Sequence, residues 1–373
     1  MKRKIINSIL TAGIVMSLVG CGTGSQSASS GETEEHTSYN VAENTETASG
    51  EDAETAQTPA DGTVTDEAAA GETATEETPA EQPASQEGVP TVYMTTDISP
   101  EGLMSAYEAL GVTINAENVA VKLSTGENGS NYLDPALIQD LVQTVDGTIV
   151  ECNTAYGGDR SNTAMHKQLA EDHGYTAIAD VDIMDEEGSI SIPIEGGQQL
   201  TEDMVGSHFA NYDYFVVLSH FKGHAMAGYG GAIKNISIGI ASSDGKNVIH
   251  TANQGGSMWS AAQDPFLESM ADAGKGVSDY LNGNIIYINV MNRLSVDCDC
   301  DGNPAEPDMH DIGILASTDP VALDQACIDL VYANEDGGSL VERIESRNGL
   351  HTLEAAEAIG LGSRTYSLES IDG

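Results

Sequence analysis

The segment Ser219–Asn235 combines residue types that could bind a small anion. It reads SHFKGHAMAGYGGAIKN, with four glycines and two lysines directly after an apolar run. Basic residues are scarce, because the whole chain has 14 Lys and Arg against 59 Asp and Glu. A glycine without Cβ lets backbone N–H groups approach a ligand, and a neighbouring lysine adds a positive charge. We therefore predict a ligand site at Lys222, His224, Gly230, Gly231, Lys234 and Asn235, with Lys246 nearby. The alternative is a tight loop whose lysines only offset nearby carboxylates.

A second segment, 297–308, has the spacing of a calcium-binding loop. Three aspartates alternate along DCDCDG, so their carboxylates could face one hard cation, and Gly302 permits a sharp turn. Pro304 is unusual for such a loop, and the flanking sequence does not predict the paired helices of an EF-hand. The predicted metal ligands are Asp297, Asp299, Asp301 and Asp308.

The cysteines of the same segment allow two alternatives. Cys298 and Cys300, with Cys152 at a strand end, could form a thiolate site for zinc or iron. In an exported protein the Cys298–Cys300 pair could instead be oxidised to a local disulfide. We prefer calcium to thiolate coordination, because the cell exterior is rich in calcium and poor in free soft metals. Cys327 lies on an apolar helix face and is interpreted as a small buried hydrophobe.

A sheet whose strands alternate with helices is predicted to position these residues. Short apolar runs predict strands at 91–94, 118–123, 147–151, 178–183, 214–218, 284–290 and 312–315. Capping residues followed by proline, together with apolar periodicity, predict helices at 100–110, 135–145, 163–173, 265–281 and 320–332. This alternation predicts an α/β fold with a parallel or mixed sheet and flanking helices.

Four polar loops follow predicted strands. Parallel sheets bind ligands beyond the carboxyl ends of their strands, so we predict that these loops share one cleft; independent surface loops are the alternative. The loops are 152–160, the turn with Asp185, Glu186 and Glu187, the segment 219–235, and 297–302.

The first 90 residues predict export and attachment to a membrane. Residues 1–21 have three basic residues, an apolar run and the sequence LVGC, which resembles the lipobox of bacterial lipoproteins. Cys21 would then carry the lipid and be the membrane contact of an extracytoplasmic protein on the bacterial cell membrane. Residues 22–90 predict a disordered acidic tether, since 31–90 hold 16 Asp and Glu and no Lys or Arg.

Residues 91–373 are enough for one α/β domain with a proper core. They hold 11 Lys and Arg against 43 Asp and Glu, which argues against nucleic acid as a partner and against an electrostatic grip on anionic lipid. Four cysteines are too few for a scaffold built on disulfides. The sequence has no convincing hydrolase, zinc-protease or nucleotide-binding motif, so those enzyme classes are unsupported.

Three stretches resemble a known family. They are LSHFKGHAMAGYGGAIKNISIGIAS, ECNTAYGGDRSNTAMH, and SVDCDCDGNPAEPDMHDIGILASTDPVALDQACIDLV. Together they resemble domain-of-unknown-function family 362, often labelled iron–sulfur-centre proteins, over most of residues 91–373. The resemblance implies an iron–sulfur cluster as an alternative cofactor. The ferredoxin-like unit that many members add, with repeated Cys-x-x-Cys spacing, is not found in this sequence.

These observations support three hypotheses about function. The first is a lipid-anchored domain with a metal-assisted site for a small anionic ligand. The second is a lipoprotein that captures a ligand without transforming it, and the third is an iron–sulfur or redox protein. Whether the chain is an enzyme stays open at the level of sequence.

Overall fold

The structure is a computed structural model that describes residues 88–260 and 262–373. The predicted signal peptide, Cys21 and nearly all of the predicted tether lie outside the described residues. Within the described part of the chain, no helix is long and apolar enough to cross a membrane.

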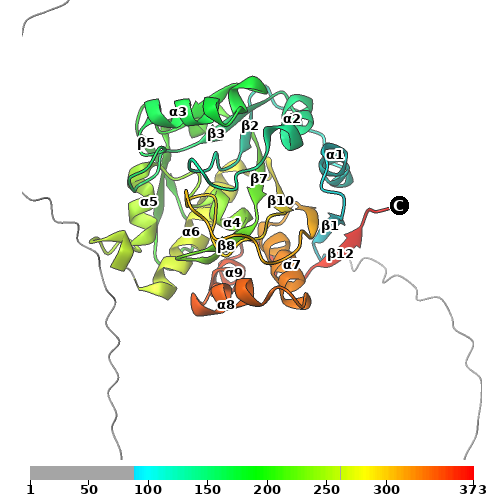
Figure 1. Cartoon of the computed structure of the whole chain (residues 1–373). Helices are drawn as coiled ribbons and strands as arrows, with labels where there is room; N and C mark the ends of the chain where they lie inside the picture. Colours follow the sequence, from blue (N-terminus) through cyan, green and yellow to red (C-terminus); the bar gives the residue numbers. More distant parts are fainter. Residues whose placement is uncertain (1–87, 261) are drawn as a thin grey trace, which may run out of the picture. The chain divides into compact units, whose positions relative to one another are not determined.

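An eight-stranded mixed sheet forms the centre of the domain (Figure 1). Its order is β12-β1-β11-β10-β7-β2-β3-β4, and the five strands from β10 to β4 run parallel. β11 is antiparallel to both of its neighbours, and β12 is parallel to β1. The strands are β1 (Thr91–Thr95), β2 (Val119–Lys122), β3 (Gly147–Glu151), β4 (Val181–Ile183), β7 (Tyr214–His220), β10 (Ile285–Met291), β11 (Gly313–Ser317) and β12 (Ser367–Ser370).

Helices flank this sheet, and the predicted capping signals are present at three of them. Ser99, Asp134 and Asp319 each precede a proline and accept hydrogen bonds from the first turns of α1, α2 and α7. The helices are α1 (Pro100–Ala109), α2 (Pro135–Thr144), α3 (Thr163–Asp172), α4 (Ala232–Ile236), α5 (Ser243–His250), α6 (Gln263–Leu281), α7 (Pro320–Ala333), α8 (Gly338–Ser346) and α9 (His351–Ala358). The predicted α/β class, with a mixed sheet and flanking helices, is confirmed.

The sheet is covered on both faces, which explains why its central strands are apolar throughout. Along β7, Phe215 and Val217 belong to one buried cluster, whereas Val216 and Leu218 belong to the other. Helices α4, α6 and α7 contribute to the first cluster, and α1 and α2 contribute to the second. The loops at the carboxyl ends of the parallel strands therefore start from a rigid base.

The structure also corrects the predicted elements. The predicted strand 178–183 is shorter, because a 3₁₀ turn at Tyr175–Ala177 precedes it and the Tyr175 hydroxyl donates to Leu133 O at 2.8 Å. Several short elements were missed because their polar or glycine-rich sequences lack a clear period. They are α4, α5, α8, α9, β12, β5 (Ser189–Pro193), β6 (Glu202–Gly206), β8 (Lys222–His224) and β9 (Gly228–Gly230).

Asp203 on β6 is a buried carboxyl group that should make stability depend on pH. Its side chain is 1% exposed, and neither carboxyl oxygen has a hydrogen-bond partner among the described residues. Burial raises the pKa of Asp203 to about 7. The folded state therefore retains a proton that the unfolded chain releases near pH ~3.9.

We predict that Asp203 lowers the free energy of unfolding as the pH rises from about 4 to about 7, by on the order of 3 kcal/mol. Asp203→Asn should remove this component, and Asp140→Asn, at an exposed position on α2, should leave it unchanged. Urea unfolding at pH 5 and pH 8 measures the difference. Equal pH dependence in the wild type and Asp203→Asn would contradict the prediction.

Candidate anion site

A cavity of about 120 Å³ opens at the carboxyl ends of β2, β3 and β7. Three of the four polar loops identified in the sequence contribute to its wall. The fourth supports it from behind, since the Asp185 carboxylate accepts hydrogen bonds from Asn153 N and Ser243 N. Polar lining residues are Lys122, Ser124, Glu151, Thr154, Tyr156, Arg160, Ser219, His220, His224, Lys234, Asn235, Lys246, His250 and Asp299, with the glycines Gly230, Gly231 and Gly239 and the cysteines Cys298 and Cys300.

Three lysines surround the cavity, and the protein satisfies only two of their ammonium groups. Lys122 Nζ donates to Leu123 O and to Asn235 Oδ1, both at 2.8 Å. Lys246 Nζ donates to Ala241 O at 2.6 Å. Lys234 Nζ has no hydrogen bond or ion pair with any residue that the structure describes, although it lines the cavity. An ammonium group without a partner in a partly buried place is a natural contact for a bound anion.

The three lysines also destabilise one another's charged forms, because their positive charges repel. Burial lowers the pKa of Lys234 to about 8, and the positive charges of Arg160, Lys122 and Lys246 add to this effect. Burial likewise lowers the pKa of Lys122 to about 8, although the Glu151 carboxylate opposes the shift. A bound anion would relieve both the desolvation and the repulsion.

Arg160 is fixed by two carboxylates beside the lysines. Its Nε donates to Glu127 at 3.0 Å and its Nη1 donates to Glu151 at 2.8 Å. Burial alone would raise the pKa of Glu151, but Arg160 and the hydrogen bond to His166 hold that pKa well below its usual value. Arg160 therefore has little capacity left for a ligand, and its main effect on the cavity is electrostatic.

Helix α4 presents Lys234 to the cavity, and Asp324 holds the start of this helix. The buried Asp324 carboxylate accepts hydrogen bonds from Ala232 N at 2.7 Å and Ile233 N at 3.0 Å. A Cβ at Gly231 would lie 2.3 Å from Asp324 Oδ1, so this glycine is required for the close approach. The Gly-rich sequence thus serves the packing of α4.

Asn235 and Gly230 line the cavity in supporting positions. The Asn235 amide donates to the backbone carbonyls of Lys122 and Leu218, and its oxygen accepts from Lys122 Nζ. Asn235 therefore ties the ends of β2 and β7 together and fixes one lysine. A Cβ at Gly230 would lie 3.2 Å from Lys234 Cδ, so the absence of a side chain leaves room for that lysine.

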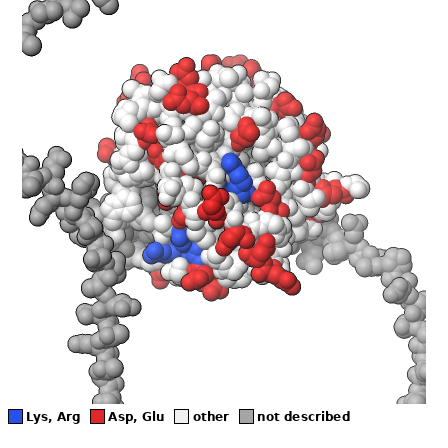
Figure 2. Space-filling model, viewed as in Figure 1, with Lys and Arg blue, Asp and Glu red and all other residues white. Residues whose placement is uncertain are grey.

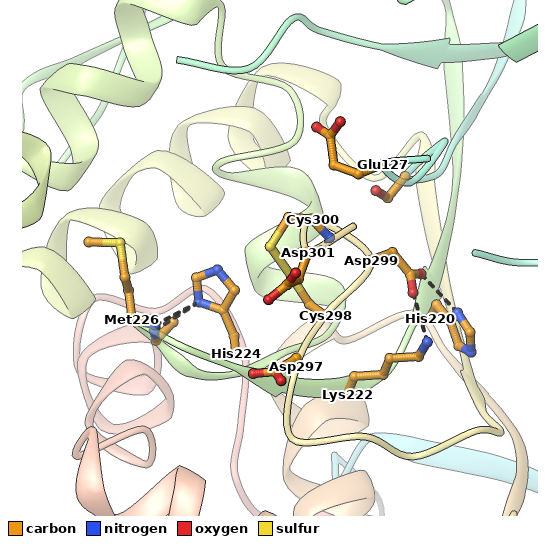
Figure 3. Close-up of a disulfide and its surroundings, with 12 residues drawn as sticks. Glu127, His220, Lys222, His224, Met226, Asp297, Cys298, Asp299, Cys300 and Asp301 are labelled. Carbon is orange, nitrogen blue, oxygen red and sulfur yellow. Dashed lines mark hydrogen bonds and ion pairs between the residues drawn. A yellow bond between two sulfur atoms is a disulfide. The ribbon is translucent and has the colours of Figure 1, made fainter. Parts of the chain in front are cut away.

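Lys222 does not line the cavity, which corrects its predicted role as a ligand residue. Its ammonium group donates to Asp299 Oδ1 at 2.7 Å (Figure 3). It also donates to Asn131 O at 2.8 Å. His220 Nδ1 lies 2.9 Å from the other carboxylate oxygen, so Asp299 is bound from two sides. Burial would raise the pKa of Asp299, but His220 and Lys222 together lower it. The triad anchors the 297–302 loop against β7 and β8.

The aspartates predicted to bind calcium contact separate partners. Asp297 pairs with Arg343 at 3.0 Å, and Asp301 accepts a hydrogen bond from Asn303 N. Asp308 accepts one from Ser339 Oγ, at 2.6 Å. Among the described residues, these carboxylates form no group whose oxygens converge on one centre. The alternating spacing is present, but neighbouring elements draw each side chain in a different direction.

The cysteines form a different arrangement from the predicted thiolate site. Cys298 and Cys300 are joined in a disulfide, which was the alternative considered from sequence. Cys152 is separate, with its thiol 3.2 Å from Ile240 O, and burial raises its pKa to about 12. Cys327 is buried on α7, as its apolar helix face indicated.

His224, and not Cys152 as predicted, is the third potential metal ligand beside Cys298 and Cys300. A ring nitrogen of His224 and the two sulfurs of the Cys298–Cys300 pair lie within 4.8 Å of one another, a group that could hold a metal. The donors do not fit a metal as they stand, because the sulfurs are bonded to each other and His224 Nδ1 accepts hydrogen bonds from Ala227 N and Met226 N. The described cysteines also do not supply the four thiolates of an iron–sulfur cluster.

Sequence reasoning missed Lys122 and Arg160 as cavity residues. Lys122 ends the apolar strand Val119–Lys122, and a lysine at the end of a buried strand is a usable signal. Arg160 was inside a loop that we singled out, but nothing in its spacing indicated the two carboxylates that bind it.

A family model matches the part of the chain that contains the cavity. The model of the family described as "Domain of unknown function (DUF362)" matches residues 119–329. The chain belongs to the DUF362 family. All the lining residues lie inside the matched DUF362 region. No curated protein matches the chain.

Two solved structures are similar to this DUF362 protein. The lactate racemase apoprotein from Thermoanaerobacterium thermosaccharolyticum has 15% identity and a TM-score of 0.40, over 66% of this chain and 57% of that one. A Thermotoga maritima protein solved by structural genomics has 12% identity and a TM-score of 0.39, over 69% of this chain and 58% of that one. The DUF362 chain thus spans less than two thirds of either structure.

Proposed function

We propose that this DUF362 protein is an extracytoplasmic lipoprotein whose domain binds a small anionic ligand in the cavity around Lys234. One observation carries the proposal. Lys234 lines the cavity and its Nζ has no partner among the described residues, while Lys122 and Lys246 line the same cavity. The ligand class is a carboxylate or phosphate of low molecular weight, because the cavity is small and its unpartnered group is a point charge.

The charge of the rest of the protein supports a site that acts at short range. Acidic side chains predominate on the face in Figure 2, and the full chain carries a formal charge of −45. Such a surface slows the approach of an anion, so the affinity must come from contacts inside the cavity, where desolvation strengthens each charge interaction. A local positive site in an acidic protein also discriminates against large polyanions such as nucleic acid.

Two classes of function are compatible with an anion site: capture of a solute and catalysis. A measurement of substrate turnover distinguishes them. Capture of a solute requires only the cationic cavity, whereas an enzyme requires a reacting group beside the bound anion. The disulfide on the cavity wall is a specific observation that favours a redox role. A soft divalent metal such as zinc stays a proposal for the state in which Cys298 and Cys300 are reduced, with His224 as the third member of the group that would hold it.

Lys234→Met should weaken the binding of acetate or inorganic phosphate at least ~10-fold, since it removes the unpartnered charge (about 1.4 kcal/mol or more). Lys167→Met is the matched control, because Lys167 is an exposed lysine on α3 that does not line the cavity. Isothermal calorimetry on folded variants measures both affinities. An unchanged affinity in Lys234→Met, or an equal loss in Lys167→Met, would reject the site.

Attachment through Cys21 has its own test. In a bacterial host the wild-type chain should appear in the membrane fraction, and mass spectrometry should show a diacylglycerol on an N-terminal cysteine. Cys21→Ser should release the protein from that fraction and leave ligand binding by the folded domain unchanged. Recovery of unmodified wild-type protein from the soluble fraction would show that the lipid anchor is absent.

A further inference from the structure

The Cys298–Cys300 disulfide lies on the wall of the cavity that contains Lys234. Both cysteines are partly exposed there, and they also line the adjoining groove that includes Trp259. The two free cysteines of the described residues, Cys152 and Cys327, are fully buried instead. A small molecule in the cavity can therefore reach this disulfide.

The disulfide is not needed to hold its loop in place. It joins residues two apart in sequence, and closing so short a loop removes little entropy from the unfolded chain. The loop is fixed independently, because Asp299 is bound by Lys222 and its carbonyl accepts from Glu127 N at 2.8 Å. A sulfur–sulfur bond that is accessible and adds little stability is the kind that takes part in exchange chemistry.

Nearby groups can stabilise the thiolates that exchange produces. Cys300 N already lies 3.2 Å from Cys298 Sγ, in position to donate to it. His224 Nδ1 accepts two backbone N–H groups, so the proton of the neutral ring is on Nε2, which makes that nitrogen a donor. Hydrogen bonds donated to a thiolate stabilise its charged form and make it a better leaving group.

We propose that the Cys298–Cys300 disulfide is a thiol-exchange centre whose substrate is a small thiol bearing a carboxylate or phosphate. The inference rests on the proposed function, because Lys234 holds the anionic group. A substrate thiolate attacks one sulfur and expels the other as a thiolate, which forms a mixed disulfide. A second thiolate attacks the substrate sulfur of that mixed disulfide. Two thiols are thereby oxidised to one small disulfide, and the protein gains two electrons and two protons as a dithiol.

Reduction of the disulfide by two small thiols tests this proposal on the folded chain. The probes are 3-mercaptopropionate, which is anionic, and 2-mercaptoethanol, which is neutral; each rate is divided by the rate of the same thiol with hydroxyethyl disulfide. Alkylation and mass spectrometry follow Cys298 and Cys300. We expect a normalised preference of at least ~10-fold for the anionic thiol, lost in Lys234→Met and retained in Lys167→Met.

Competition in the wild type makes the test independent of how the variants fold. Inorganic phosphate should slow the anionic thiol and leave the neutral thiol unaffected. Equal normalised rates, or no competition, would overturn the exchange proposal. Reduced protein that holds zinc tightly, without any exchange with small thiols, would overturn it in favour of a metal site.

The two proposals can fail separately. If calorimetry shows that Lys234 binds phosphate while both thiols react equally, the exchange centre is rejected and the anion site stands. If neither phosphate nor acetate binds, both are rejected.

Discussion

Three lysine ammonium groups around one small cavity impose a free-energy cost that the surrounding structure must offset. Lys122 and Lys246 are stabilised by backbone carbonyls and by the Asn235 amide. Lys234 receives no such compensation from the described residues, and the start of its helix is held rigidly by Asp324. The chain therefore retains one charge that a ligand can satisfy, while its neighbours are fixed before the ligand arrives. Preorganisation of this kind improves affinity because little ordering is left to occur on binding.

Two groups of residues in the cavity lining have different roles. Lys122, Lys234 and Lys246 give one part of the lining a positive charge. In another part, the loop that carries Cys298 and Cys300 is anchored by Asp299 against Lys222 and His220. Figure 3 shows how this triad holds the loop beside His224. The buried ion pair thus positions the disulfide, and of its members Asp299 and His220 also line the cavity whereas Lys222 does not.

The fold could be predicted from the sequence because the central strands are buried on both faces and the helices carry clear caps. The location of the site at the strand ends followed from the same reasoning. The roles of individual site residues were harder to predict, since each role depends on contacts with residues that are distant in sequence. Lys222 and Asp299 are 77 residues apart, so neither a lysine beside glycines nor an alternating aspartate loop could reveal their pairing. Spacing also predicted the Cys298–Cys300 disulfide only as one alternative, because local sequence does not show whether a thiol faces a metal or its neighbour.

The most direct measurement of the central claim is the pKa of Lys234 in the folded protein. Nuclear magnetic resonance of ¹⁵N-labelled lysine side chains, assigned by comparison with Lys234→Met, gives this value with and without inorganic phosphate. We expect a pKa near 8 in the free protein. We also expect phosphate to raise this pKa, since the anion stabilises the charged form. A pKa at the ordinary value of ~10.4 that does not respond to phosphate would contradict the account.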